Sequence, residues 1–221
     1  MTQRIRCADG AVRERAVAAA LAAVRRGDLV IVPTESVYAL ATDAFSSRGI
    51  AALRDVKDYD GSVPIPVMVG SRSTVPGIAA RIGDDALALM EAFWPGPLTL
   101  LLRPQPTLAW DRPAEAPLAV RMPLHPVLLA LLGRSGPLAV TAANLRGRPA
   151  PTTVDDAVAQ SGEAASLALD AGDLGPDPGL ASTIVDVTGP VARIVRPGAL
   201  SEEQLRHALP RIAGDEPVTG A

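Results

Sequence analysis

Two arginines stand at the ends of short apolar segments that have the character of buried strands. Arg121 follows Ala119-Val120, and Arg196 follows Ile194-Val195. A guanidinium group close to a buried strand needs an anionic partner, and it binds carboxylate or phosphate through paired, charge-assisted hydrogen bonds. These two positions therefore point to a site that holds an anion by charge and by hydrogen bonding.

Hydroxyl and amide side chains stand beside other apolar segments in the same way. They are Thr34 after the run 29–33, Thr141 and Asn144 at the end of the run 138–141, and Ser182 before the run 183–187. Taken singly, each has an ordinary structural explanation: Thr34 can cap a turn, Asn144 can hold one, and Ser182 can begin a strand. In sheets with mixed helices, however, loops at strand ends gather polar groups around ligands. We expect these residues to share one site.

Lys57 is the only lysine among the 21 basic residues of the chain, the other twenty being arginines. Such a bias usually reflects codon composition, and in that case its position means nothing. Alternatively, Lys57 marks a place where a compact ammonium group is required and a planar guanidinium does not serve. Its position at the end of a predicted helix over residues 47–57 keeps the second interpretation open.

Hydrophobic periodicity predicts the elements that position these residues. The pattern predicts helices near 11–26, 47–57, 73–80, 84–92, 126–132, 153–159 and 201–209, and strands near 29–32, 65–69, 98–102, 118–121, 138–141, 166–169, 183–187 and 191–195. Strand-like runs follow one another near 98–121 and 166–195, so the order is not a clean βαβ alternation. We therefore expect an α/β (α+β) fold with a mixed sheet. No linker divides the chain, which predicts one domain over 1–212 and a disordered tail over 213–221.

Composition excludes several classes of protein. Hydrophobic residues make up 48% of the 221 residues, but no apolar run is long enough to span a membrane. No basic N-terminal segment leads into an apolar block, and the single Cys7 can form no internal disulfide, so we expect a cytoplasmic protein. A net charge of −3 gives no general attraction for nucleic acid.

Common catalytic motifs are missing as well. Neither of the usual glycine-rich phosphate-binding loops occurs, and the two histidines, His125 and His207, cannot build a zinc site with one cysteine. His125 lies beside no nucleophile motif, and we expect it to begin a helix. Any anion site must therefore come from residues gathered across the chain.

Several runs, taken together in this order, resemble the YrdC-like family of threonylcarbamoyl-AMP synthases. The runs are Pro33-Thr34-Glu35-Ser36-Val37-Tyr38-Ala39-Leu40, Lys57 ahead of Pro64-Ile65, Trp94-Pro95-Gly96-Pro97-Leu98-Thr99, Val120-Arg121-Met122-Pro123, Thr141-Ala142-Ala143-Asn144, Ser182-Thr183-Ile184-Val185-Asp186 and Arg196-Pro197-Gly198-Ala199. The resemblance covers roughly residues 12–209, and it implies a twisted mixed sheet with flanking helices and a concave ligand-binding surface.

The resemblance implies a reaction that joins L-threonine, bicarbonate and ATP into threonylcarbamoyl-AMP and pyrophosphate. A tRNA threonylcarbamoyltransferase then uses the product to modify adenosine in certain tRNAs. Carried over by position, the threonine-binding residues are Thr34, Arg121 and Ser182, and the residues around ATP are Lys57, Thr141, Ala143, Asn144 and Arg196. Lys57 would be the catalytic residue that reaches the phosphates, and Mg²⁺ would bridge the phosphate oxygens.

The sequence departs from the family pattern at several positions. The family carries Lys-x-Arg and Ser-x-Asn, whereas here Tyr59 follows Lys57-Asp58, and Ala142 stands where the serine is expected. Ala39 replaces a usual glycine, and Ser62 stands where some members have a histidine. Tyrosine offers a phosphate at most one neutral hydrogen bond in place of a bidentate cation, and the acids on either side of Tyr59 oppose phosphate binding.

These departures leave three functions open. The first is the synthase, with Arg54 or Arg72 covering the lost charge. The second is a weak or inactive relative that binds a nucleotide or double-stranded RNA in the same hollow. The third is carbamoyl transfer to another acceptor, because similar domains occur in carbamoyltransferases.

Overall fold

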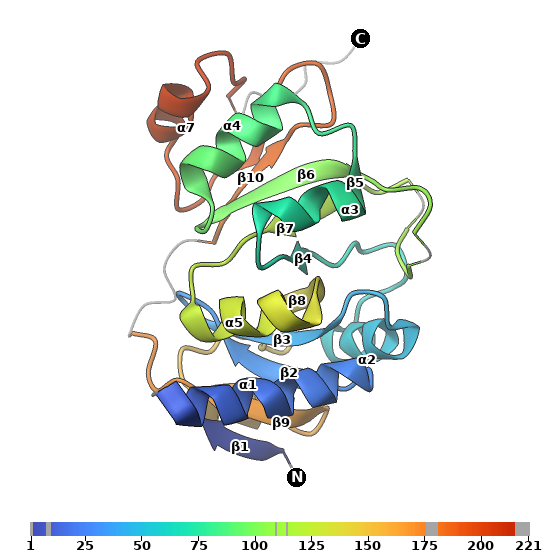
Figure 1. Ribbon diagram of the computed structural model, residues 1–221, viewed down its shortest axis with the longest axis vertical. Helices are drawn as coiled ribbons and strands as arrows, with labels where there is room; N and C mark the ends of the chain where they lie inside the picture. Colours follow the sequence, from blue (N-terminus) through green and yellow to red (C-terminus); the bar gives the residue numbers. More distant parts are fainter. Residues whose placement is uncertain (1, 8–9, 109, 114, 176–180, 215–221) are drawn as a thin grey trace.

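A long mixed sheet organises the protein, and the computed structural model describes residues 2–7, 10–108, 110–113, 115–175 and 181–214 (Figure 1). Its strands are β1 (Gln3–Arg6), β2 (Leu29–Pro33), β3 (Tyr38–Asp43), β4 (Val67–Met68), β5 (Ala79–Ala80), β6 (Leu98–Pro104), β7 (Leu118–Arg121), β8 (Leu138–Ala142), β9 (Ala165–Asp170), β10 (Thr183–Asp186) and β11 (Arg193–Arg196). They lie in the order β1-β9-β2-β3-β8-β4-β7-β6-β10-β11, and β5 pairs with β6. Parallel and antiparallel pairs alternate irregularly, which confirms the predicted mixed sheet.

Helices cover both faces of this sheet. They are α1 (Gly10–Arg25), α2 (Ser47–Lys57), α3 (Val75–Ile78), α4 (Asp84–Phe93), α5 (Pro126–Ser135), α6 (Val154–Ser161) and α7 (Glu202–Ala208), and a 3₁₀ turn, η1 (Arg72–Thr74), precedes α3. Helices α1 and α5 lie against each other over β2, β3 and β9 (Figure 1), and their apolar faces form one buried cluster with these strands. The other helices pack into a second cluster that runs along the opposite face and into the β6–β7 region.

Three strands lie outside the sequence prediction. The most consequential is β3, which pairs antiparallel with both β2 and β8 in the middle of the sheet. Residues 38–42 of this strand are buried on both faces, so they show no apolar–polar alternation, and two alanines lower their strand propensity. The other two, β1 and β5, are short strands that gain their definition from pairing with β9 and β6.

The predicted helix over 73–80 is confirmed for residues 75–78 and is wrong for its last two residues. The segment is divided into η1, α3 and then β5, because Ala79 and Ala80 pair with Pro104 and Arg103 at the end of β6. Ala213 also differs from the expected disordered tail, since it forms a bridge with Arg193, and its N–H donates to Ala192 O at 2.8 Å. Residues 215–221 of that predicted tail lie outside the described residues.

No helix within the described residues is both long and apolar enough to cross a membrane.

Candidate functional site

A cavity of about 420 Å³ brings together residues from most of the central strands. Five of the residues singled out in the sequence line it: Thr34, Thr141, Arg121, Ser182 and Arg196. They come from the turn after β2, from β8 and β7, from the residue just before β10, and from the end of β11. These five residues therefore surround one cavity, whereas Lys57, Ala143 and Asn144 are not among the described residues that line it.

Strand alternation explains why Arg121 faces the cavity. In β7, Leu118 and Val120 are buried in the core, so Ala119 and Arg121 point to the other face. Thr99 pairs with Arg121 in register and lies on the same wall of the cavity. Because alternate residues of a strand point to opposite faces, burial of the apolar residues in the core directs the residues between them toward the cavity.

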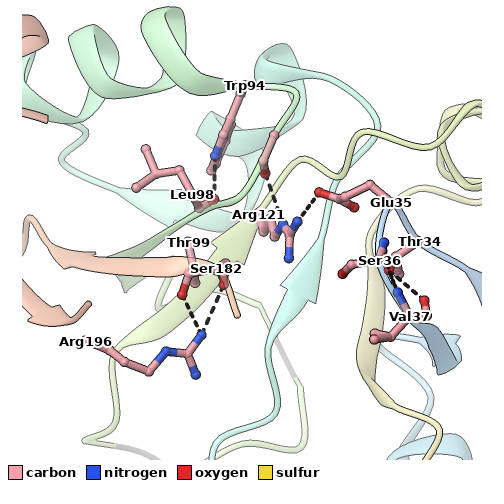
Figure 2. Close-up of polar contacts among 11 residues, drawn as sticks. Thr34, Glu35, Ser36, Val37, Trp94, Leu98, Thr99, Arg121, Ser182 and Arg196 are labelled. Carbon is pink, nitrogen blue, oxygen red and sulfur yellow. Dashed lines mark hydrogen bonds and ion pairs between the residues drawn. The ribbon is translucent and has the colours of Figure 1, made fainter. Parts of the chain in front are cut away.

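Arg121 is held by two hydrogen bonds on one edge of its guanidinium. Its Nε donates to Gly96 O at 3.0 Å, and its Nη2 donates to a carboxylate oxygen of Glu35 (Figure 2). Gly96 is placed by its own N–H, which donates to Met122 O at 2.9 Å. The Trp-Pro-Gly-Pro-Leu-Thr run therefore helps to position this arginine.

Arg196 faces the same cavity from β11. Its Nη2 donates to Ser182 O at 2.7 Å and lies 3.1 Å from Ser182 Oγ, and that hydroxyl lies 2.8 Å from Thr99 Oγ1 (Figure 2). Partial burial lowers the pKa of Arg196, and the neighbouring charge of Arg121 lowers it further. No ion pair joins Arg196 to an acid among the described residues, so an anion in the cavity would supply the missing charge.

Gly198 allows the segment after Arg196 to approach the start of β10. A Cβ atom at this position would lie 2.3 Å from Ala181 O and 2.6 Å from Thr183 N, closer than real contacts allow. Ala199 N donates to Ala181 O at 2.9 Å, which holds the two backbones together. The Arg-Pro-Gly run therefore sets the distance between Arg196 and Ser182.

Thr34 shapes the turn between β2 and β3. Its Oγ1 donates to Val37 O at 2.6 Å and accepts the Val37 N–H at 3.1 Å, so the hydroxyl is engaged within its own turn. Ser36 is carried into the cavity wall by the same turn.

Lys57, Ala143 and Asn144 form a group behind the cavity wall. The buried Lys57 ammonium donates to Ala142 O at 3.1 Å and to Asn144 Oδ1 at 3.0 Å, and it also bonds Asn144 O. Burial lowers the pKa of Lys57. Ala143 is fully buried, and its carbonyl accepts the Ser161 hydroxyl at 2.6 Å. Ala142 lines the cavity, so this group touches the site through that residue.

The arginines suggested as replacements for the one lost at Tyr59 do not take that role. Arg54 is directed to Asp111, with Nη1 at 2.7 Å from Oδ1, because the loop before β7 brings this acid beside α2. Arg72 lies on the exposed η1 turn and is not among the residues that line the cavity. The expectation that either residue covers the lost charge is therefore wrong.

Three residues of the site received no role from the sequence. Glu35, Ser36 and Thr99 each lie within the recognised runs, yet Glu35 contacts Arg121 while Ser36 and Thr99 line the cavity. Thr99 could have been found from alternation, since it stands between Leu98 and Leu100, both fully buried. The partner of Glu35 depends on a contact across 86 residues that no local pattern reveals.

No group of three or more His, Cys, Asp or Glu side chains suited to a metal ion occurs in the described parts of the chain.

Comparison with known proteins places these features in context. The Sua5/YciO/YrdC family model, described as "Telomere recombination", matches residues 22–198. A Mycobacterium tuberculosis protein, provisionally named as a threonylcarbamoyl-AMP synthase, is 41% identical over 210 residues, covering 95% of this chain and 96% of its own. The Bacillus subtilis threonylcarbamoyl-AMP synthase is 30% identical over 203 residues, covering 90% of this chain and 58% of its own.

A solved structure is similar over the whole architecture. Pyrococcus abyssi Sua5, determined in complex with L-threonine, superposes with a TM-score of 0.86 at 27% identity. The match covers 97% of this chain but only 62% of the Sua5 chain, so the archaeal protein is considerably longer.

Proposed function

The chain belongs to the Sua5/YciO/YrdC family, and from that premise we propose that it is a threonylcarbamoyl-AMP synthase. The reaction joins L-threonine, bicarbonate and ATP into threonylcarbamoyl-AMP and pyrophosphate. The observation that carries the proposal is the pair of guanidinium groups, Arg121 and Arg196, in one cavity of about 420 Å³. That volume lies in the range of small-molecule sites, and the two groups suit the two anions that the reaction brings together.

Arg121 supports the threonine half of this proposal. Its unengaged N–H groups can bind the amino-acid carboxylate as a bidentate pair. Ser182 and Thr99 lie on the same wall and offer hydroxyls to a small polar ligand. Threonine held in this way directs its amine into the cavity. There the amine nitrogen can attack carbon dioxide, formed from bicarbonate by loss of hydroxide, to give a carbamate; the proton that the amine releases combines with the hydroxide as water.

Arg196 supports the nucleotide half. The carbamate oxygen attacks the α-phosphorus of ATP, and pyrophosphate leaves with the electrons of the broken P–O bond. Catalysis of this kind depends on positioning and on the neutralisation of phosphate charge. Arg196 supplies such a charge, and Thr141 lines the same cavity. We assign Ala143 and Asn144 to the same half because they follow Ala142, which lines the cavity. Lys57 joins them because its ammonium donates to Ala142 O and to Asn144.

In this proposal Mg²⁺ is bound by the phosphates of ATP and not by side chains of the protein. The described residues that line the cavity include no carboxylate, so this part of the wall offers the metal no carboxylate ligand. Mg²⁺ commonly keeps several waters and binds nucleotide phosphates rather than a protein cage. We propose that the reaction occurs in the cytoplasm and that a tRNA threonylcarbamoyltransferase takes up the product.

One observation favours a weaker relative as the second candidate. Ala142 places a methyl group on the cavity wall where the family pattern has a hydroxyl, and neither Arg54 nor Arg72 replaces the arginine missing at Tyr59. Loss of a single preorganised donor costs about 2.7–4 kcal/mol of transition-state stabilisation. The alternative function is therefore binding of a nucleotide, tRNA or double-stranded RNA in the same cavity with little turnover.

A single assay separates these functions. The full chain is incubated with ATP, MgCl₂, bicarbonate and labelled threonine, and threonine-dependent pyrophosphate is measured against an Arg196→Met variant. Release above that variant supports the synthase. ATP or RNA binding without turnover supports the second candidate, and turnover only with another amine or acceptor supports carbamoyl transfer elsewhere.

A further inference from the structure

Glu35 lies next to the cavity without forming part of its wall. Its carboxylate bonds Arg121 Nη2, and only 19% of the Glu35 side chain and 14% of the Arg121 side chain remain exposed. Glu35 is not among the described residues that line the cavity, whereas Arg121 is. The pair thus joins a residue behind the site to one that faces a ligand.

The bonds to Arg121 leave a defined part of its guanidinium available. Nε and Nη2 lie on one edge of the planar group, and they donate to Gly96 O and to Glu35 respectively. These bonds use two of the five N–H donors of an arginine. In Figure 2 the third nitrogen points away from both bonds, into the space between Ser182 and Ser36. A carboxylate entering that space meets the unengaged end of the guanidinium.

The burial of the Glu35 carboxylate opposes folding, so its position calls for an explanation other than stability. Its second oxygen, Oε2, is buried and has no hydrogen-bond partner among the described residues. A buried carboxylate oxygen without a partner opposes folding, and such a group is expected where it serves the geometry of a site.

The negative charge of Glu35 also offsets the repulsion between the two arginines of the cavity, Arg121 and Arg196. Arg121 and Arg196 lie close enough for the charge of Arg121 to disfavour the charged form of Arg196. Two guanidinium groups in one small cavity repel each other until an anion arrives. The Glu35 carboxylate offsets this repulsion on the Arg121 side and keeps that guanidinium from turning away.

We propose that Glu35 is a positioning residue that fixes Arg121 with its free N–H groups toward the carboxylate of the amino-acid substrate. The inference rests on the proposed function for the identity of that substrate. It does not make Glu35 a ligand of threonine, because Glu35 acts through Arg121. The turn formed by Thr34 and Val37 holds Glu35 in place for this purpose.

A first experiment tests the positioning without requiring activity. The full chain is labelled with ¹⁵N-arginine, and the Nη signals of Arg121 are recorded in the wild type, Glu35→Ala and Glu35→Gln, with Arg121→Lys for assignment. Restricted rotation should give separate Nη signals in the wild type and in Glu35→Gln, which keeps an acceptor oxygen. The signals should coalesce in Glu35→Ala. Separate signals in folded Glu35→Ala would overturn the proposal.

The matched control is Glu14→Ala. Glu14 also pairs with an arginine, Arg134, at 3.4 Å, but on the exposed surface. This variant should leave the Arg121 signals unchanged. A comparable change in the control would show that the effect in Glu35→Ala is not local, and that result also counts against the proposal.

A second experiment measures substrate dependence. Glu35→Ala should raise the KM for threonine about tenfold or more while the KM for ATP stays within about threefold, and Glu35→Gln should restore most of the threonine KM. An equal rise in both constants, or an unchanged threonine KM, contradicts the proposal. If the wild type shows no threonine-dependent turnover, the proposed function fails, and the Arg121 signals alone decide the role of Glu35.

Discussion

Lys57 binds both the side-chain and the backbone oxygen of Asn144, and it thereby ties the end of α2 to the segment after β8. The Lys57 Nζ lies 3.0 Å from Asn144 Oδ1, and Asn144 Nδ2 in turn donates to Arg148 O at 2.7 Å. The ammonium has three donors, and three oxygens of residues 142 and 144 accept them. In this arrangement Lys57 orders the loop beside the cavity.

Replacement of Lys57 by Met should therefore lower stability as well as activity. The methionine fills much of the volume but leaves the oxygens of Ala142 and Asn144 without their donor, which costs about 1–3 kcal/mol of unfolding free energy. The measurement is urea unfolding together with the KM for ATP. Arg146→Met, which removes an exposed partner of Asp58, serves as control and should change neither. A raised ATP KM at unchanged stability would instead identify Lys57 as a direct phosphate ligand.

Arg196→Met should reduce kcat/KM for ATP by about 10²–10³, the loss expected for one preorganised donor at a charged transition state. Arg193→Met is the matched control, because Arg193 lies on the same strand but is not among the residues lining the cavity. The measurement is threonine-dependent pyrophosphate release at varied ATP. An equal loss of kcat/KM in the two variants would show that the arginines of β11 support the structure of the strand and that Arg196 has no specific role toward ATP.

Several residues of the cavity wall could be predicted from the sequence, because they follow an apolar strand residue or alternate with one. Arg121 could be found in this way, since Val120 is fully buried beside it. The contact between Glu35 and Arg121 could not, because it joins residues from turns and strands far apart in the chain. Strand β3 also escaped prediction, since a central strand of small buried residues has no alternating pattern.

Ala142→Ser should increase activity. The Ala142 side chain lines the cavity, so a serine there adds a hydroxyl that can bond a phosphate oxygen without disturbing the pairing of Ala142 with Ala39. We expect kcat/KM for ATP to rise about tenfold, in keeping with one added hydrogen bond to a charged group. Ala139→Ser, a buried position on the other face of β8, is the comparison. A decrease in activity for Ala142→Ser would mean that the cavity binds its ligand differently from the proposal.

Gly198→Ala should lower the free energy of unfolding by about 1–3 kcal/mol, because the new Cβ forces the backbone at Ala181 and Thr183 to move. The movement should also weaken threonine binding, since Ser182 lies in the displaced segment. Gly133→Ala is the control: its Cβ meets nothing within 4 Å in helix α5, and it should stabilise slightly. Thermal unfolding and the threonine KM are measured on both. Unchanged stability in Gly198→Ala would contradict the close approach of the two backbones.

Tyr38 should make the folded protein sensitive to alkaline pH. Its hydroxyl donates to Gly172 O at 2.7 Å and accepts the Ala171 N–H at 3.0 Å, and burial raises its pKa from 10.0 to about 12. Between these values the unfolded chain releases the proton that the folded chain retains. The Tyr38 contribution is therefore fully present below pH 10 and is lost as the pH rises through 12.

The loss from Tyr38 should be on the order of 2–3 kcal/mol of unfolding free energy. Urea unfolding at several pH values between 9 and 12 measures it in the wild type, Tyr38→Phe and Tyr59→Phe. Tyr38→Phe should show the weaker pH dependence, although Cys7 keeps part of it because burial raises the pKa of that thiol to about 11. Tyr59→Phe should follow the wild type. The same slope in Tyr38→Phe as in the wild type would show that the Tyr38 hydroxyl does not retain its proton in the folded state.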